Sequence, residues 1–212
     1  MTGLCRLDPN TGVGDPTPAF TYCLNLAEVE VDTATGKTTV LRFTCVSDVG
    51  KVGNIDSVNG QAYGGISHAI GFALGENYDD VKKHTNIAAS GVPYIETIPD
   101  ELEVIYYERP DESGPFGSSG ASEGFQSSGH MAVLNGIYNA CGVRVYEMPA
   151  SPEKVKAGID TLAAGGKITP PKKYFLGSDL YEELENIRAN PVQAGPEDYF
   201  VPLGSGTAER FF

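Results

Sequence analysis

The stretch that most constrains the fold of this chain runs from Gly114 to Glu123, because it interrupts regular structure just before a helical pattern. Its glycines, Gly114, Gly117 and Gly120, permit positive φ angles and let a ligand approach the main chain closely. Free amide N–H groups and serine hydroxyls suit a phosphate or another oxygen-rich group. These residues alone predict either a ligand cradle with an acid at its rim or a solvated linker, and they leave both interpretations open.

The composition of the chain predicts a soluble globular protein and excludes several classes of partner. The chain has 212 residues, of which 41% are hydrophobic, so it is long enough to bury a core. Its 28 acidic and 15 basic residues give a formal net charge of −13, which opposes binding to nucleic acid or to an anionic membrane surface. No apolar run reaches the roughly 18 residues of a membrane span, and the N-terminus lacks the order of a signal peptide. The sequence therefore predicts a cytoplasmic protein.

The cysteines and histidines do not have the spacing of a metal site. No CxxC pair is present, so neither zinc nor an iron–sulfur cluster has its usual ligands. We expect free thiols at all four cysteines: Cys5, Cys23, Cys45 and Cys141. Two of them, Cys23 and Cys45, could face each other across a strand pair. The histidines are expected to be structural or surface residues: His68, His84 and His130.

The first half of the chain predicts a β-hairpin followed by a helix. Residues 20–31 and 38–49 alternate in hydropathy, and the turn between them contains Gly36, which suits a left-handed conformation. Residues 57–74 have apolar side chains at helical spacing, but four glycines interrupt them: Gly60, Gly64, Gly65 and Gly71. Each glycine costs a helix about 1 kcal/mol relative to alanine, so four of them require close packing or a ligand. Gln61 has an amide that can donate and accept together, as a heterocyclic ring edge requires, although an exposed and idle glutamine is the commoner outcome.

The second half of the chain alternates predicted strands and helices. Residues 102–107 predict a strand. A helix after the glycine-rich loop is expected to end at Gly142, a natural C-terminal cap, with one apolar stripe: Met131, Leu134, Tyr138 and Cys141. Residues 143–146 predict a short strand. Two further helices are expected, one capped by Ser151 and one at residues 178–190.

These elements predict an α+β fold with mixed sheets, because they lack the regular βαβ rhythm of a doubly wound sheet. The hairpin argues for antiparallel pairing in the first portion of the chain. We expect an extended lead-in at residues 1–18, one domain at residues 19–190 and an extended tail at residues 191–212.

Several short motifs follow one another along the chain. They are Glu28-Val-Glu-Val-Asp-Thr-Ala-Thr-Gly-Lys, then Asp48-Val-Gly, then Gly60-Gln61 with Gly64-Gly65 and Gly71, then the loop closing on Glu123, then Asn139-Ala140 with Gly142, Arg144 and Pro149. This ordered series resembles the C-terminal part of the large molybdenum-binding region of the xanthine oxidase family, and within that family it looks most like the bacterial aldehyde oxidoreductases. The resemblance runs from about residue 18 to the helix after Pro152. It favours the ligand cradle over the linker.

The resemblance implies a hydroxylase that carries molybdenum on a pyranopterin (molybdopterin), which in bacteria is usually extended with cytosine dinucleotide. Glu123 matches the general base of that family, which accepts a proton as an aldehyde is oxidised to a carboxylic acid with water as the oxygen source. Gln61 matches a glutamine that hydrogen-bonds the pterin. Four loop residues match positions that hold the pterin and place the metal: Ser119, Gly120, Ala121 and Ser122.

Two local features bear on the expected role of Glu123. Its apolar neighbours, Phe116, Ala121 and Phe125, could partly desolvate the carboxylate, which would raise its pKa and make it a better proton acceptor. The family commonly has glycine directly before this glutamate, whereas this chain has Ser122, so the backbone there would need a less permissive conformation.

The resemblance also implies partners. The family's cluster-binding segments and the earlier part of its molybdenum-binding region are not in these 212 residues. We therefore expect one subunit of a split enzyme, or a fragment, with other chains supplying the rest of the molybdenum site, 2Fe–2S clusters and, optionally, FAD. Two alternatives stay open: a substrate that is an N-heterocycle of the xanthine or nicotinate type, and a non-catalytic subunit that only braces a partner.

Overall fold

The computed structural model describes residues 19–170 without a gap, together with residues 7, 8, 10–12, 14, 182, 186, 189 and 190. One compact unit spans Ala19–Thr169 and contains every strand and helix discussed below. The predicted helix at 178–190, the predicted tail at 191–212 and the predicted lead-in lie largely outside the described residues. The expected domain boundaries therefore stay predictions.

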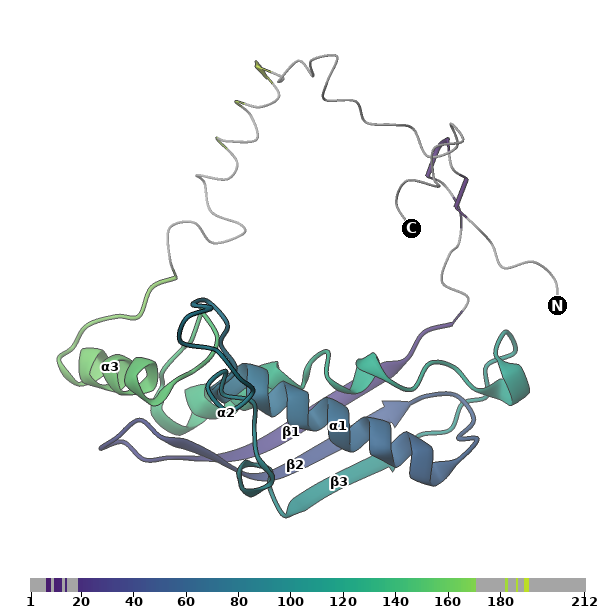
Figure 1. The fold of residues 1–212 in the computed structure, drawn as a ribbon, viewed down its shortest axis with the longest axis horizontal. Coiled ribbons are helices and arrows are strands. Elements are labelled where there is room, and N and C mark those ends of the chain that lie inside the picture. The colour runs from purple at the N-terminus through teal and green to yellow at the C-terminus, as the bar shows by residue number, and fades with distance from the viewer. Residues whose placement is uncertain are drawn as a thin grey trace. The chain divides into compact units, whose positions relative to one another are not determined.

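A mixed sheet of three strands, in the order β1-β2-β3, forms the base of this unit. Strands β1 (Tyr22–Val31) and β2 (Thr38–Asp48) pair antiparallel, whereas β3 (Glu101–Tyr106) pairs parallel with β2 (Figure 1). Gly36 adopts a φ of +77° in the turn between β1 and β2. The predicted hairpin and the predicted α+β fold with mixed pairing are confirmed.

Three α-helices accompany the sheet: α1 (Ile55–Leu74), α2 (Gly129–Cys141) and α3 (Pro152–Ala163). Short 3-10 turns, labelled η1, η2 and η3, lie at Ile95–Thr97, Pro115–Gly117 and Glu123–Phe125. In the part of the chain that the structure describes, no helix is long and apolar enough to span a bilayer.

Local capping explains where these helices begin and end. The Asn54 side chain accepts a hydrogen bond from the Ser57 backbone N–H at 2.9 Å and starts α1. Ser151 caps α3 in the predicted way, because its hydroxyl accepts from the Lys154 N–H. Gly142 ends α2 with a φ of +76°, as its position after the apolar stripe predicts.

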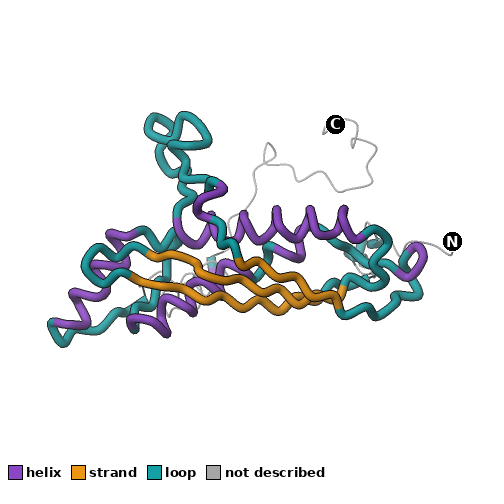
Figure 2. The backbone as a smooth tube through the Cα atoms, turned by 90° about the horizontal axis from the view of Figure 1, so that it is seen from below, coloured by secondary structure: helices purple, strands orange, loops and turns teal. Residues whose placement is uncertain are grey.

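The core lies between one face of the sheet and helices α1 and α2. Figure 2 shows α1 running along one side of the strands. The side chain of Phe43, in the central strand, is fully buried. Helix α2 approaches closely because two of its residues lack side chains: a Cβ at Gly129 would lie 2.6 Å from Ala69 Cβ, and a Cβ at Gly136 would lie 2.9 Å from Val29 Cγ2.

In the second half of the chain, one expectation is confirmed only in part and a second is wrong. The buried face of α2 is formed by Gly129, Val133, Leu134 and Ile137, whereas Met131 and Tyr138 of the predicted stripe are exposed. The other two residues of the stripe do face the core, because Leu134 is buried and Cys141 packs against it. Residues 143–146 do not form a strand, because buried Val143 packs against Gly158 of α3 instead of a neighbouring strand.

The cysteines of the hairpin are diagonal neighbours and do not face each other directly. Cys23 lies opposite Ser47, and Cys45 lies opposite Asn25. Cys23, Cys45 and Cys141 are free thiols, as expected, and the fourth cysteine is outside the described residues. Hydrogen bonding to the side chains of Cys45 and Ser47 lowers the pKa of the Cys23 thiol. Hydrogen bonding to Cys23, together with burial, raises the pKa of the Cys45 thiol.

Replacing Phe43 by alanine tests the assignment of the core. Phe43→Ala is expected to lower the free energy of unfolding by about 3–5 kcal/mol, because it leaves a cavity between the sheet and both helices. Leu41→Ala, at an exposed position of the same strand, is the control and is expected to cost less than about 1 kcal/mol. Urea unfolding measures both, and equal losses would contradict the assignment.

Candidate functional site

The glycine-rich loop is fixed to the end of β2. The Ser119 N–H donates to the Val49 carbonyl at 2.8 Å, and the Lys51 N–H donates to the Gly117 carbonyl at 2.7 Å. Gly50, between these two points, has a φ of +70°, and a Cβ there would lie 2.5 Å from the Gly117 carbonyl oxygen. The Asp48-Val-Gly motif therefore serves to bring the loop against the strand.

Within the loop, the three glycines that were expected to have positive φ angles, Gly114, Gly117 and Gly120, differ from one another. Gly117 has a positive φ of +83°. Gly114 has a negative φ, but a Cβ there would lie 1.6 Å from the Ser118 carbonyl oxygen, so only glycine fits. Gly120 does not have a positive φ, whereas Phe116 does, at +55°. The expectation of positive φ is thus confirmed for one glycine, and close main-chain contact explains a second.

A second contact joins the loop to α1. Phe125, two residues after Glu123 in η3, is fully buried, and a Cβ at Gly65 would lie only 2.7 Å from Phe125 Cβ. The same hypothetical Cβ would lie 3.1 Å from the Gln126 backbone nitrogen. The absence of a side chain at Gly65 therefore lets the loop pack directly on the helix, which places Glu123 beside α1.

Strand β1 and the residue before it supply a third set of contacts. The Thr21 hydroxyl donates to the Gly120 carbonyl at 2.5 Å, and Asn25 Nδ2 donates to the Ser128 hydroxyl at 2.7 Å. These bonds hold the loop on either side of Glu123. Sequence reasoning missed Thr21 and Asn25, because no local pattern links them to a loop about a hundred residues away.

A groove of about 340 Å³ lies between α1 and the end of the glycine-rich loop. Three predicted site residues line it together: Gln61 from α1, and Ser122 and Glu123 from the loop. The rest of the lining comes from the same segments: Gly60, Gly64, Gly65, His68, Phe72 and Gln126. The other predicted site residues, Ser119, Gly120 and Ala121, lie just before these residues on the loop and do not line the groove.

The glycines that interrupt α1 fall into two kinds. Gly65 and Gly71 have packing reasons: Gly65 meets Phe125, and a Cβ at Gly71 would lie 2.8 Å from Pro93 Cδ. A Cβ at Gly60 or Gly64 would meet nothing within 4 Å, and both glycines line the groove. These two positions leave an open, side-chain-free surface beside Gln61, which a flat ligand could approach.

The surroundings of Glu123 differ from the expectation. Glu123 is exposed, Phe116 is fully exposed, and Phe125 is buried in the core beneath the loop. The expected desolvation of the carboxylate is therefore wrong for this chain, because its apolar neighbours point into solvent or into the core. Ser122 has a φ of −138°, so the serine is accommodated without a left-handed backbone.

The polar groups around the groove fit a ligand that offers hydrogen-bond donors and acceptors. The Ser119 hydroxyl is buried and has no hydrogen-bond partner among the described residues, and a buried polar group without a partner is costly. Gln61 is exposed at the groove. His68 Nδ1 lies 3.0 Å from Gln126 Oε1, a contact between side chains. In the described part of the chain, no group of three or more His, Cys, Asp and Glu side chains is arranged to hold a metal ion.

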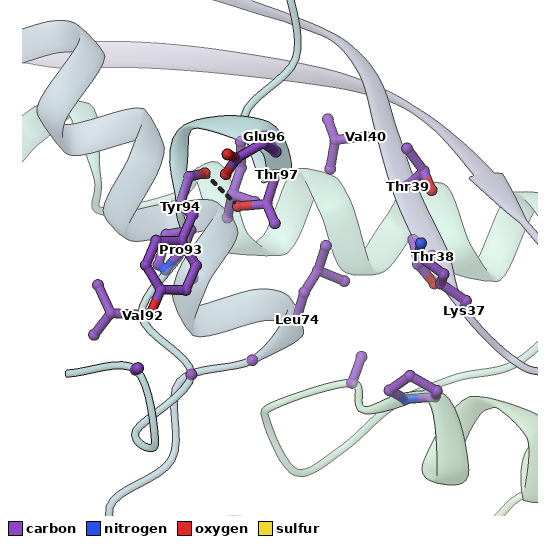
Figure 3. Close-up of a pocket in the computed structure, with 17 residues that line it drawn as sticks. Lys37, Thr38, Thr39, Val40, Leu74, Val92, Pro93, Tyr94, Glu96 and Thr97 are labelled. Carbon is purple, nitrogen blue, oxygen red and sulfur yellow. Dashed lines mark hydrogen bonds between the residues drawn. The ribbon is translucent and has the colours of Figure 1, made fainter. Parts of the chain in front are cut away.

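A second cavity, of about 380 Å³, lies at the other end of α1 (Figure 3). The C-terminal end of α1, the start of β2 and the loop before β3 form its walls, and the Thr97 hydroxyl donates to the Tyr94 carbonyl at 2.7 Å within them. Its lining is mostly apolar, with Lys37 and Glu96 as the charged side chains. It shares no lining residue with the groove at Glu123.

The sequence and the fold were compared with known proteins. Residues 1–99 match the family model described as molybdopterin cofactor-binding domain. The aldehyde oxidoreductase of Megalodesulfovibrio gigas is 44% identical over 154 residues, which make up 73% of this chain and 17% of that protein. A protein of Escherichia coli K12 named probable hypoxanthine oxidase XdhD is 31% identical over 151 residues, or 69% of this chain and 16% of that protein.

Comparison of the fold with solved structures again finds an aldehyde oxidoreductase. The crystal structure of the aldehyde oxidoreductase from Desulfovibrio desulfuricans ATCC 27774 matches with a TM-score of 0.67 and 48% identity, covering 69% of this chain and 16% of that chain. This chain therefore spans less than a fifth of the length of each of these relatives.

Two neighbouring glycines of α1 provide a matched test of how the loop is positioned. Gly65→Ala is expected to lower the free energy of unfolding by about 1–3 kcal/mol, because its Cβ would collide with Phe125 and the loop backbone. Gly64→Ala is expected to be neutral or to stabilise by up to about 1 kcal/mol, because its Cβ meets nothing and alanine favours helix. Urea unfolding compares the two variants. Equal effects would show that the loop does not rest on Gly65.

Proposed function

Since this chain belongs to the xanthine oxidase family of molybdenum hydroxylases and corresponds to part of their molybdopterin-binding region, we propose that it carries the general base of an aldehyde oxidoreductase. The whole assembly would oxidise aldehydes to carboxylic acids with water as the oxygen source. The single observation that supports this most strongly is the groove that brings Glu123 and Gln61 together, although 62 positions separate them in the sequence (123 − 61 = 62).

The residues around the groove fit a molybdopterin cofactor. The exposed Gln61 amide can donate to and accept from the edge of a pterin ring, and the glycine surface at Gly60 and Gly64 leaves room for a flat group. The Ser119 hydroxyl is buried beside the groove without lining it and has no hydrogen-bond partner among the described residues, so it would donate to an oxygen or nitrogen of the same cofactor. Ser119 and Gln61, with Gly120, Ala121 and Ser122, would therefore bind and orient it.

Glu123 would take the proton that is released when the substrate carbon gains its oxygen. Its carboxylate lines the groove, and the packing of Phe125 on Gly65 fixes the backbone directly after it. When bound, the molybdenum cofactor supplies the two-electron redox chemistry. Because Glu123 is exposed in this chain, the partner polypeptide that completes the site would exclude water and raise the proton affinity of the carboxylate.

The remaining parts of the assembly follow from the same proposal. The cofactor would be the cytosine dinucleotide form of molybdopterin. Partner chains would carry the rest of the molybdenum site, 2Fe–2S clusters and, optionally, FAD. The complex would work in the cytoplasm.

The 31% identity to a protein named as a hypoxanthine oxidase supports an N-heterocycle as the alternative substrate. The exposure of Glu123 supports the other alternative, a non-catalytic subunit that braces a partner.

Replacing Glu123 by glutamine tests the proposal directly. In the assembled enzyme, Glu123→Gln is expected to retain molybdenum and pterin but to lower kcat by about 10²–10⁴-fold, because the amide cannot accept the proton. Metal analysis, pterin fluorescence after release and aldehyde turnover measure these properties. Glu112→Gln, an exposed acid of the same loop region, is the control and should leave all three unchanged.

Full activity of Glu123→Gln would reject the general base and favour the bracing subunit. Turnover of an aldehyde is compared with turnover of hypoxanthine to decide between the two substrate classes. The true substrate class is the one that the unmodified enzyme turns over and that Glu123→Gln does not.

A further inference from the structure

One face of the sheet is directed away from α1 and α2, and one of its cross-strand rows is apolar on all three strands. Leu24, Val46 and Ile105 are direct cross-strand neighbours on β1, β2 and β3. Leu24 is 61% exposed and Ile105 is 44% exposed. Tyr22 and Leu26, on either side of Leu24 along the same face of β1, are also exposed, at 66% and 57%. We call these five residues the outer sheet face.

Strand β1 is oriented opposite to the usual pattern for a sheet with one wet face. Its large apolar side chains, Tyr22, Leu24 and Leu26, point outward, whereas Cys23 and Asn25 point toward the helices and the loop. A sheet that turns its larger apolar side chains away from its own core carries a surface for a second layer. The parallel pairing of β2 with β3 agrees with this, because parallel strands are typical of sheets that are covered on both faces.

The outer sheet face ends in an acidic border. In the same row as Leu26, Glu103 of β3 lies beside Thr44. In the next row, Arg42 lies between Glu28 and Glu101, and its Nε donates to Glu101 Oε2 at 2.6 Å. Because one arginine faces several carboxylates here, the border retains an excess of negative charge that a basic partner surface would complement.

We propose that the outer sheet face docks the polypeptide that carries the rest of the molybdenum-binding region. This inference rests on the proposed function and identifies where its partner binds. The occupant follows from length and charge: the chain spans 16–17% of the two relatives named above, so most of their length has no counterpart in these 212 residues. The docking segment presents apolar side chains to Leu24 and Ile105, and lysine or arginine to Glu28 and Glu103.

A second copy of this chain fits the face less well. Each copy carries a formal net charge of −13, so two copies repel each other.

A double substitution on β1 tests the proposal. Leu24→Thr with Leu26→Thr removes two large apolar contacts and introduces β-branched side chains that suit a strand. The purified chain is titrated with the separately purified polypeptide that bears the remaining molybdenum-binding region, and sedimentation measures the Kd. The double variant is expected to bind at least tenfold more weakly than the unmodified chain. Val81→Thr, at an exposed position in the loop before β3, is the control and should bind within twofold of it.

Two further measurements keep the test decisive. Thermal unfolding of the isolated double variant should match that of the unmodified chain, because both leucines are exposed. Hydrogen–deuterium exchange of the unmodified chain should show protection of residues 22–26 and 101–106 when the partner polypeptide is added. Absence of that protection, or binding of the double variant with the original Kd, overturns the proposal.

Other occupants of the face would give different results. A concentration-dependent dimer of this chain that the double substitution abolishes would assign the face to a second copy and overturn the proposal. Protection of residues 22–26 that depends on residues 171–212 would assign it to that segment, with the same consequence. The proposed function is judged separately by Glu123→Gln: normal docking without turnover supports it, whatever the leucine variant does.

Discussion

The candidate site depends on the contact between Gly65 of α1 and Phe125 of the loop. The side chain of Phe125 is fully buried, and the helix backbone comes so close that even one methyl group at position 65 would lie 2.7 Å from it. Since interiors are close-packed, such a contact leaves the helix and the loop little room to shift relative to each other. Gln61 on the helix and Glu123 on the loop acquire their common groove from this contact.

The sheet holds the loop from two sides. The end of β2 pairs with residues 117–119 through main-chain hydrogen bonds, and Thr21 and Asn25 reach the loop from the β1 side. The groove is therefore one prepared wall of a site and not a closed pocket. Glu123 is exposed on this wall, in a chain that spans less than a fifth of the relatives named above.

The two faces of the sheet show why an alternating pattern does not determine burial. Strand β1 alternates as predicted, but the face with Tyr22, Leu24 and Leu26 is exposed, while the face with Cys23 and Asn25 meets the loop and the helices. A period of two determines which residues share a face, and packing against other elements determines which face is inside. The same reason explains α2, where Leu134 of the predicted stripe is buried whereas Met131 and Tyr138 are exposed.

The sequence alone determined the local features of this protein: the left-handed turn at Gly36, the cap of α3 at Ser151, the end of α2 at Gly142, the mixed α+β fold and, through an ordered series of motifs, the family. These depend on backbone preferences and on short-range hydrogen bonds, which neighbouring residues set. The tertiary structure decided what distant segments do to one another. It brought Glu123 beside Gln61, left Glu123 exposed, joined Thr21 to the loop and packed Val143 on α3 instead of in a strand, because each of these outcomes depends on contacts between residues far apart in the chain.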